Sequence, residues 1–310
     1  MEYREIGKTG MKVSSISFGA SSLGGVFHPL KEEEGIKAVH TALDNGINFI
    51  DVSPYYGHLR AEIVLGKALK GLDRSRYYLS TKVGRYGKDG VNDWDYSAKR
   101  AAESVAESME RLNVDHIDLI NVHDIEFADL EQVCGETLPA LVELRDKGLV
   151  KHVGITNLTL RHFGYVIDHV PAGTVESVLS FCHYCLNDDA LADYLDYFEQ
   201  RGVGVINASP FSMGLLTERG APDWHPAPKP LRDLCRRAVD HCRSRGKRIE
   251  QLALRFAVDN RRIATTLFST TRPEAVLKNM EWAGQPLDKE LLAEVQHILE
   301  PGFRDTWLNS

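Results

Sequence analysis

The chain has 310 residues, of which 43% are hydrophobic and 26% charged, which is ordinary for a soluble protein with ample material for a core. Its net charge of −7 and the lack of a dense lysine and arginine run argue against nucleic acid as a partner. No stretch approaches the roughly 18 apolar residues of a membrane span, and the polar start MEYREIGKTG is no signal peptide. We therefore expect a cytoplasmic protein without a membrane partner.

Five cysteines are present: Cys134, Cys182, Cys185, Cys235 and Cys242. An odd count without a secretion signal fits a reducing compartment. Cys182 and Cys185 have the CxxC spacing of redox sites, and Cys235 and Cys242 with a nearby histidine could suggest a metal. Neither group has the surrounding pattern of such sites, so we interpret these cysteines as structural or incidental thiols and predict no metal.

Strand and helix patterns alternate along the chain. Residues 3–18 alternate in polarity and contain two glycines, which predicts a hairpin leading into the first interior strand. Apolar runs bounded by turn residues predict eight strands, at 16–19, 47–50, 77–82, 117–122, 150–155, 174–180, 203–208 and 263–268. Helical spacing predicts helices at 32–43, 60–70, 97–112, 136–147, 159–168, 188–200, 232–245, 249–259, 273–282 and 288–299. A proline-rich segment, 209–231, interrupts the alternation.

Eight strand–helix units imply right-handed crossovers and a parallel sheet. In a chain of this length they favour an α/β fold, a closed (β/α)8 TIM barrel, with an N-terminal hairpin and a C-terminal helical extension. An open dinucleotide-binding sheet is disfavoured because GASSLGG, which follows the first strand, lacks the GxGxxG spacing. We find no linker, so residues 1–310 are predicted to form one domain.

Polar residues stand where the predicted strands end, which is where barrels place their chemistry. The stretch INFIDVSPYYG ends one strand at Asp51 and carries Tyr56 on the following loop, while Lys82 and His123 end the next two strands. A lysine near the Tyr56 hydroxyl would lower its pKa from about 10. An aspartate would fix that lysine, and a neutral histidine could orient a substrate oxygen.

Each of these residues also has a purely structural interpretation. Asp51 and Lys82 could form a buried ion pair, Tyr56 could be a loop aromatic, and His123 could be a satisfied core histidine. Convergence of all four at one end of one barrel is harder to explain that way, so we predict a catalytic tetrad.

These four residues, together with GITN at 154–157, resemble the aldo-keto reductases over nearly the whole chain. Within that superfamily the resemblance is greatest to the aldose 1-dehydrogenases, among them the L-galactose dehydrogenases of plants. The segments that carry it are FGASSLGGVFHP, DVSPYYG, STKVGRYG, VHDIEF, SVLSFCHYCLND and ASPFSMGLLTERGAPDWHPA. Their loop sequences are unusual, which makes the match specific.

The resemblance implies hydride transfer with a nicotinamide cofactor, Tyr56 as general acid and base, and His123 as the group that orients the substrate. The cofactor-binding residues it implies are Thr156, Asn157, Ser180, Ser209, Phe211, Ser269, Arg272 and Asn279. Two positions depart from the common family pattern. Ala208 stands where an aromatic residue usually stacks on the nicotinamide, and Ser180 where many members have glutamine; both departures also occur in the aldose dehydrogenase branch.

Arg272 is displaced by one position from the arginine that binds the 2′-phosphate in NADPH-specific relatives, so the resemblance favours NAD, with NADP possible. The predicted reaction is oxidation of L-galactose or an L-fucose-like sugar at C1 to the aldonolactone, by a monomer or homodimer. Candidate sugar contacts on predicted loops are His58, Trp94, Tyr96 and Trp224. The alternatives are an NADPH-dependent aldehyde and ketone reductase of broad specificity, and a cofactor-binding barrel that serves as a sensor or subunit.

Overall fold

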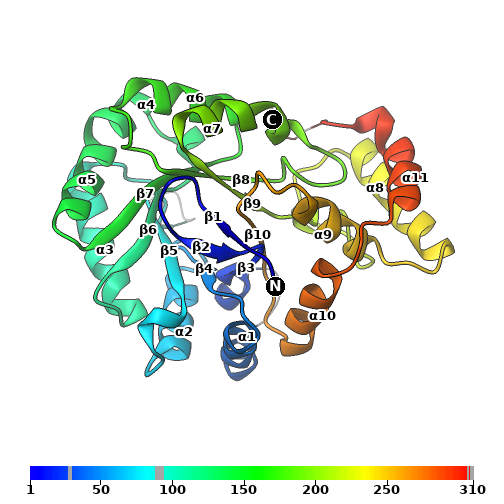
Figure 1. Cartoon of the computed structure of the whole chain (residues 1–310), viewed down its shortest axis with the longest axis horizontal. Coiled ribbons are helices and arrows are strands. Elements are labelled where there is room, and N and C mark those ends of the chain that lie inside the picture. The colour runs from blue at the N-terminus through cyan, green and yellow to red at the C-terminus, as the bar shows by residue number, and fades with distance from the viewer. Residues whose placement is uncertain (27–29, 88–93, 306, 308–310) are drawn as a thin grey trace.

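The computed structural model describes residues 1–26, 30–87, 94–305 and 307, so residues 27–29 of the FGASSLGGVFHP segment lie outside it. Eight parallel strands close into a barrel in the order β10-β3-β4-β5-β6-β7-β8-β9, which confirms the predicted fold (Figure 1). The strands are β3 (Ile16–Gly19), β4 (Phe49–Asp51), β5 (Tyr78–Val83), β6 (Ile117–Val122), β7 (Val150–Asn157), β8 (Ser177–Phe181), β9 (Gly204–Ala208) and β10 (Thr265–Phe268).

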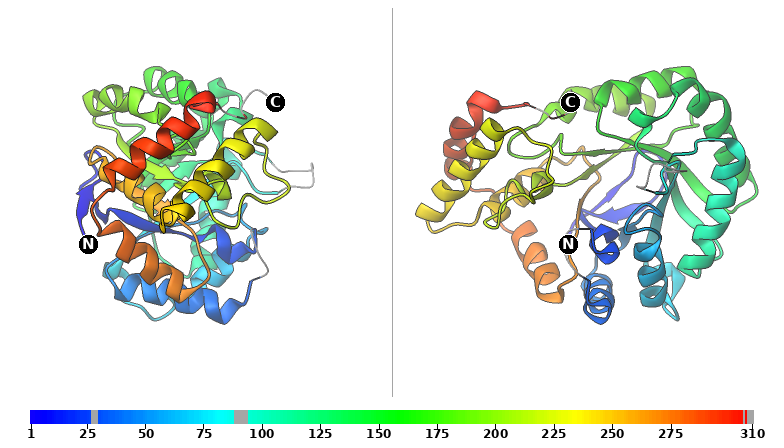
Figure 2. Two further views of the ribbon diagram at one scale, coloured as in Figure 1. Left: turned by 90° about the vertical axis from the view of Figure 1, so that its right-hand side faces the viewer. Right: turned by 180° about the vertical axis from the view of Figure 1, so that it is seen from behind.

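Helices surround this barrel, and α8, α9 and α11 gather on one side of the molecule (Figures 1 and 2). The helices are α1 (Glu32–Asp44), α2 (Arg60–Leu69), α3 (Ala98–Leu112), α4 (Leu130–Gln132), α5 (Leu138–Asp146), α6 (Leu160–His169), α7 (Leu195–Arg201), α8 (Lys229–Ser244), α9 (Ile249–Asp259), α10 (Pro273–Ala283) and α11 (Lys289–Leu299). The predicted C-terminal helical extension is α11, which packs with α8 and α9 around a separate apolar cluster. None of the described helices is long and apolar enough to cross a membrane.

Several predicted boundaries were wrong; the strand expected at 174–180, for example, forms as β8 at Ser177–Phe181. The strand expected at 47–50 forms two residues later, as β4, and the helix expected at 188–200 splits into a short 3-10 segment, Ala190–Tyr194, and α7. The helix expected from 232 already begins at Lys229, because Pro230 occupies its first turn, where a missing N–H costs no hydrogen bond.

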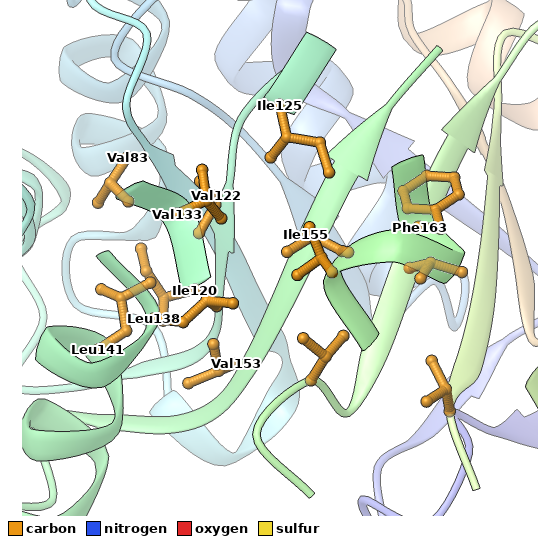
Figure 3. Close-up of a cluster of buried hydrophobic side chains, with 14 of the residues drawn as sticks. Val83, Ile120, Val122, Ile125, Val133, Leu138, Leu141, Val153, Ile155 and Phe163 are labelled. Atoms are coloured by element: carbon orange, nitrogen blue, oxygen red, sulfur yellow. The ribbon is translucent and has the colours of Figure 1, made fainter. Parts of the chain in front are cut away.

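The core lies in layers on the two faces of the barrel wall. Outward-facing side chains such as Val122 and Ile155 pack against helix residues such as Leu141 and Phe163 (Figure 3). Inward-facing residues form a smaller cluster that includes Phe49. Because side chains alternate along a strand, the same strands can present polar residues to the barrel interior further along.

A hairpin of β1 (Tyr3–Glu5) and β2 (Lys12–Ser14) closes one mouth of the barrel, and it crosses the barrel centre in Figure 1. Ile6 and Met11 extend the interior cluster from this hairpin. At Gly7, with φ +52°, a Cβ would lie only 2.4 Å from the backbone nitrogen of Gly204 at the start of β9. The hairpin thus seals the N-terminal mouth, which leaves the C-terminal mouth for a site.

Candidate active site

Asp51 and Lys82 form a buried ion pair at the C-terminal ends of β4 and β5. Lys82 Nζ donates to Asp51 Oδ1 at 2.5 Å, and the two side chains are only 1% and 4% exposed. Ser80, which shares the inward face of β5 with Lys82, donates to the other carboxylate oxygen at 2.8 Å. Both charges are therefore compensated, as a buried pair requires.

Tyr56 lies on the loop after β4 with its hydroxyl 3.3 Å from Lys82 Nζ. Close backbone packing fixes this loop, because a Cβ on Gly24 would lie 2.6 Å from the Tyr56 carbonyl, and one on Gly57 would lie 2.1 Å from Gly24 O. Gly57 also has φ +63°, a conformation that L residues rarely adopt. Two glycines from separate segments thus allow the approach that places Tyr56.

Lys82 lowers the pKa of Tyr56 as expected, but it does not set the net direction of the shift. Burial of the hydroxyl raises the pKa of Tyr56 above its usual value, and the nearby Lys82 charge only partly opposes that rise. Burial would lower the pKa of Lys82, but the Asp51 carboxylate and the Tyr56 hydroxyl together outweigh this effect, and the net pKa is raised. At neutral pH the site therefore holds a protonated phenol beside an ammonium group.

His123 follows β6 and is neutral. Burial, together with the charges of Lys82 and Arg85, holds its pKa well below the usual value. Ser53 Oγ lies 3.1 Å from His123 Nδ1 and already accepts a hydrogen bond from the Tyr55 backbone N–H, so its own proton is available for Nδ1. Assigned from these partners, the tautomer carries its proton on Nε2, 3.6 Å from the next carboxylate, Asp124 Oδ2.

The structure adds two residues that sequence reasoning missed, Arg85 and Asp124. Arg85 Nη1 donates to Asp124 Oδ2 at 2.5 Å, directly beside His123. Both residues stand in quoted segments, STKVGRYG and VHDIEF, so the available signal was a charged pair flanking the ends of adjacent strands. The four predicted residues and this pair together form a polar cluster at one barrel mouth.

Thr156 and Asn157 end β7 next to this cluster. Asn157 is held on both sides of its amide, because Oδ1 accepts from Glu126 N at 2.8 Å and Nδ2 donates to Thr159 O at 2.8 Å. Ser180 is its register partner on β8, and the buried Ser180 Oγ has no hydrogen-bond partner among the described residues. A buried hydroxyl without a partner, next to a fixed amide, fits a carboxamide-binding position.

Ser269, Arg272 and Asn279 lie where β10 leads into α10. Ser269 Oγ accepts a hydrogen bond from Ser22 N at 2.9 Å, so this loop is joined to the segment after β3. Asn279 is buried on α10, whereas the Arg272 side chain is 68% exposed and 3.7 Å from Glu274. A carboxylate beside this arginine disfavours a further phosphate there.

The loop after β9 carries backbone strain. Ser209, Ser212 and Met213 have φ values of 59°, 48° and 48°, in the left-handed region that non-glycine residues rarely adopt. Phe211 lies between them and packs against two apolar clusters. Such strain concentrates at functional sites, and here it follows Ala208, which stands where the family resemblance implies an aromatic residue.

The predicted sugar contacts differ in position. Trp94 lies at the mouth, with Arg85 over its ring at 4.4 Å. His58 is exposed on the Tyr56 loop, with φ 51°. Tyr96 is buried rather than on an open loop, and its hydroxyl donates to the backbone carbonyl of His123 at 2.8 Å. Trp224 is 55% exposed and stacks beside a histidine in the segment before α8.

The thiols carry no redox chemistry that the structure supports. The five cysteines are free, and all except Cys134 are buried. Burial raises the pKa of Cys182 to about 12 and that of its CxxC partner Cys185 well above the usual value, so neither is a reactive thiolate at neutral pH.

The sequence and the fold are both similar to those of known proteins. Residues 15–300 match the Aldo/keto reductase family. The chain is 47% identical to an L-galactose dehydrogenase from Arabidopsis thaliana over 313 residues, covering 99% of this chain and 97% of that protein. It is 28% identical to a D-threo-aldose 1-dehydrogenase from a Pseudomonas species, covering 92% and 94% of the two chains. An aldo-keto reductase from Bacillus halodurans, solved in its holo form, superposes with a TM-score of 0.79 at 25% identity, covering 96% of each chain.

Proposed function

This chain belongs to the aldo/keto reductase family and is an oxidoreductase, and we propose that it oxidises an aldose at C1 to the aldonolactone with NAD. The observation that carries the proposal is the tetrad of Asp51, Tyr56, Lys82 and His123, brought together at the barrel mouth of a chain 47% identical to an L-galactose dehydrogenase. L-galactose or an L-fucose-like pyranose is the proposed substrate.

The proposed cofactor fits the residues around the tetrad. Asn157 and the unpartnered Ser180 hydroxyl would hold the carboxamide, and the segment from Ser269 to Asn279 would hold the adenosine end. A bound nicotinamide supplies the acceptor for the hydride from C1. The exposed Arg272 with Glu274 beside it favours NAD over NADP.

The tetrad moves the proton of the reaction. Tyr56, as phenolate, takes the proton from the anomeric hydroxyl, and the Lys82 ammonium at 3.3 Å stabilises the phenolate charge. Asp51 keeps Lys82 charged and in place. His123 donates from Nε2 to the same substrate oxygen, and because its pKa is held low it does not compete with Tyr56 for the proton.

A reductase of aldehydes and ketones using NADPH is the second candidate, and one observation favours it. The raised pKa of Tyr56 keeps its hydroxyl protonated at neutral pH, which is the form that a general acid needs for carbonyl reduction. Oxidation needs the phenolate and should therefore run faster at alkaline pH.

Steady-state reduction of NAD⁺ with a panel of aldoses tests the proposal. L-galactose and L-fucose should be oxidised, and oxidation should depend on Tyr56. A Tyr56→Phe variant should lose at least about a thousandfold in turnover, whereas the matched change of the exposed Tyr165→Phe should lose nothing. Oxidation of NADPH by simple aldehydes, with no sugar oxidised, would support the second candidate instead.

A further inference from the structure

Asp124 is held in a conformation that has to be enforced. Its φ is +48°, and two side chains fix its backbone: the Thr156 hydroxyl accepts from its N–H at 3.0 Å, and the Tyr96 hydroxyl donates to its carbonyl at 3.0 Å. Its side chain is only 6% exposed. A strained residue persists only where its surroundings over-determine it, and here they direct a carboxylate toward the reacting centre.

Arg85 fixes that carboxylate from the mouth of the barrel. Its guanidinium lies 3.7 Å from the Tyr55 ring centroid and 4.4 Å from that of Trp94, so it contacts the faces of two aromatic rings. Phe127 packs against Trp94 in a tilted arrangement, with ring centroids 4.2 Å apart, and adds a third aromatic ring beside Arg85. These contacts restrict the orientation of the planar Arg85 guanidinium. The Asp124 carboxylate that it binds can still accept a further hydrogen bond.

The distance from Asp124 to His123 sets which substrate group this carboxylate can reach. Asp124 Oδ2 lies 3.6 Å from His123 Nε2, the donor to the reacting oxygen. Two substrate oxygens, each one hydrogen-bond length of about 2.7–3.0 Å from one of these two atoms, can therefore lie side by side. Oxygens on adjacent carbons meet that condition.

We propose that Asp124, oriented by Arg85, accepts a hydrogen bond from the hydroxyl on the carbon next to the reacting carbon, and so selects sugars over simple alcohols and aldehydes. This inference rests on the proposed function for the identity of the reacting oxygen. It makes Asp124 a specificity-determining residue and Arg85 a positioning residue.

A substrate lacking one hydroxyl tests the contact. For the unmodified protein, kcat/KM should fall by about 10- to 150-fold from L-galactose to 2-deoxy-L-galactose, the range for a hydrogen bond to a charged group. L-fucose, which lacks a remote hydroxyl on C6, serves as the control sugar. In Asp124→Asn the two galactose substrates should differ by less than about threefold, with the loss confined to L-galactose and L-fucose.

Three further variants separate selectivity from folding. Arg85→Met should reduce the ratio of kcat/KM for L-galactose to kcat/KM for 2-deoxy-L-galactose, and Arg85→Lys should restore part of that ratio. Asp129→Asn makes the same chemical change as Asp124→Asn at an exposed position five residues along the chain and should leave the ratio intact. The proposal is overturned if kcat/KM for 2-deoxy-L-galactose equals that for L-galactose. It is also overturned if Asp124→Asn lowers kcat/KM for both substrates by the same factor. Should no sugar be oxidised, the ratio of lactaldehyde to propanal in the reductive direction reads the same contact.

Discussion

Breaking the Asp51–Lys82 pair from one side should destabilise the protein far more than removing both charges. In Asp51→Asn the amide still accepts from Ser80, but the Lys82 ammonium stays buried with only Val52 O at 2.8 Å and the Tyr56 hydroxyl as partners. Leaving one member of a buried pair uncompensated costs about 3–5 kcal/mol. That is a large share of the roughly 5–15 kcal/mol that stabilises a typical domain.

Urea unfolding followed by circular dichroism measures this loss. Asp233→Asn is a matched control, because Lys229 and Asp233 approach to 2.6 Å but remain 83% and 61% exposed. It should cost less than about 1 kcal/mol. The double variant Asp51→Asn with Lys82→Met should be more stable than Asp51→Asn alone, although inactive. The reasoning is refuted if Asp51→Asn costs no more than the surface control, or if the double variant is less stable than either single one.

Three further outcomes are expected. Because the pKa of His123 is lowered in the folded protein, the free energy of unfolding should be highest above about pH 6.5 and should fall as the pH falls. In His123→Gln the free energy of unfolding should depend less on acid pH. An equal pH dependence in the two proteins would contradict this. Arg272→Ala should raise KM for NADP⁺ more than for NAD⁺, while Glu274→Gln should lower KM for NADP⁺ about two- to fivefold; equal effects on both cofactors would show that neither side chain reads the phosphate. Gly24→Ala should lower kcat at least tenfold, because its Cβ would displace the Tyr56 backbone. Circular dichroism should show that the variant still folds. An unchanged kcat would mean that the Tyr56 loop shifts to accommodate the Cβ without loss of activity.

Sequence alone determined the repeating architecture and grouped the four residues of the proposed tetrad. Alternation of apolar strands with amphipathic helices is a local signal, and parallel strands bring their C-terminal ends to one mouth. Asp51, Lys82 and His123 could therefore be grouped without knowing any distance between them. Boundaries were less certain, as at β4, because hydrogen bonding with neighbouring strands decides where a ladder begins.

Tertiary structure decided what local patterns do not encode. The pKa of Tyr56 depends on how far its surroundings exclude water from the hydroxyl. This burial raises the pKa by more than the Lys82 charge lowers it. The role of Gly24 appears only when the segment after β3 meets the Tyr56 loop. Arg85 and Asp124 follow different strands and are 39 positions apart in the sequence. Only closure of the barrel places Arg85 over the Tyr55 ring and brings Asp124 next to it, beside the proposed tetrad.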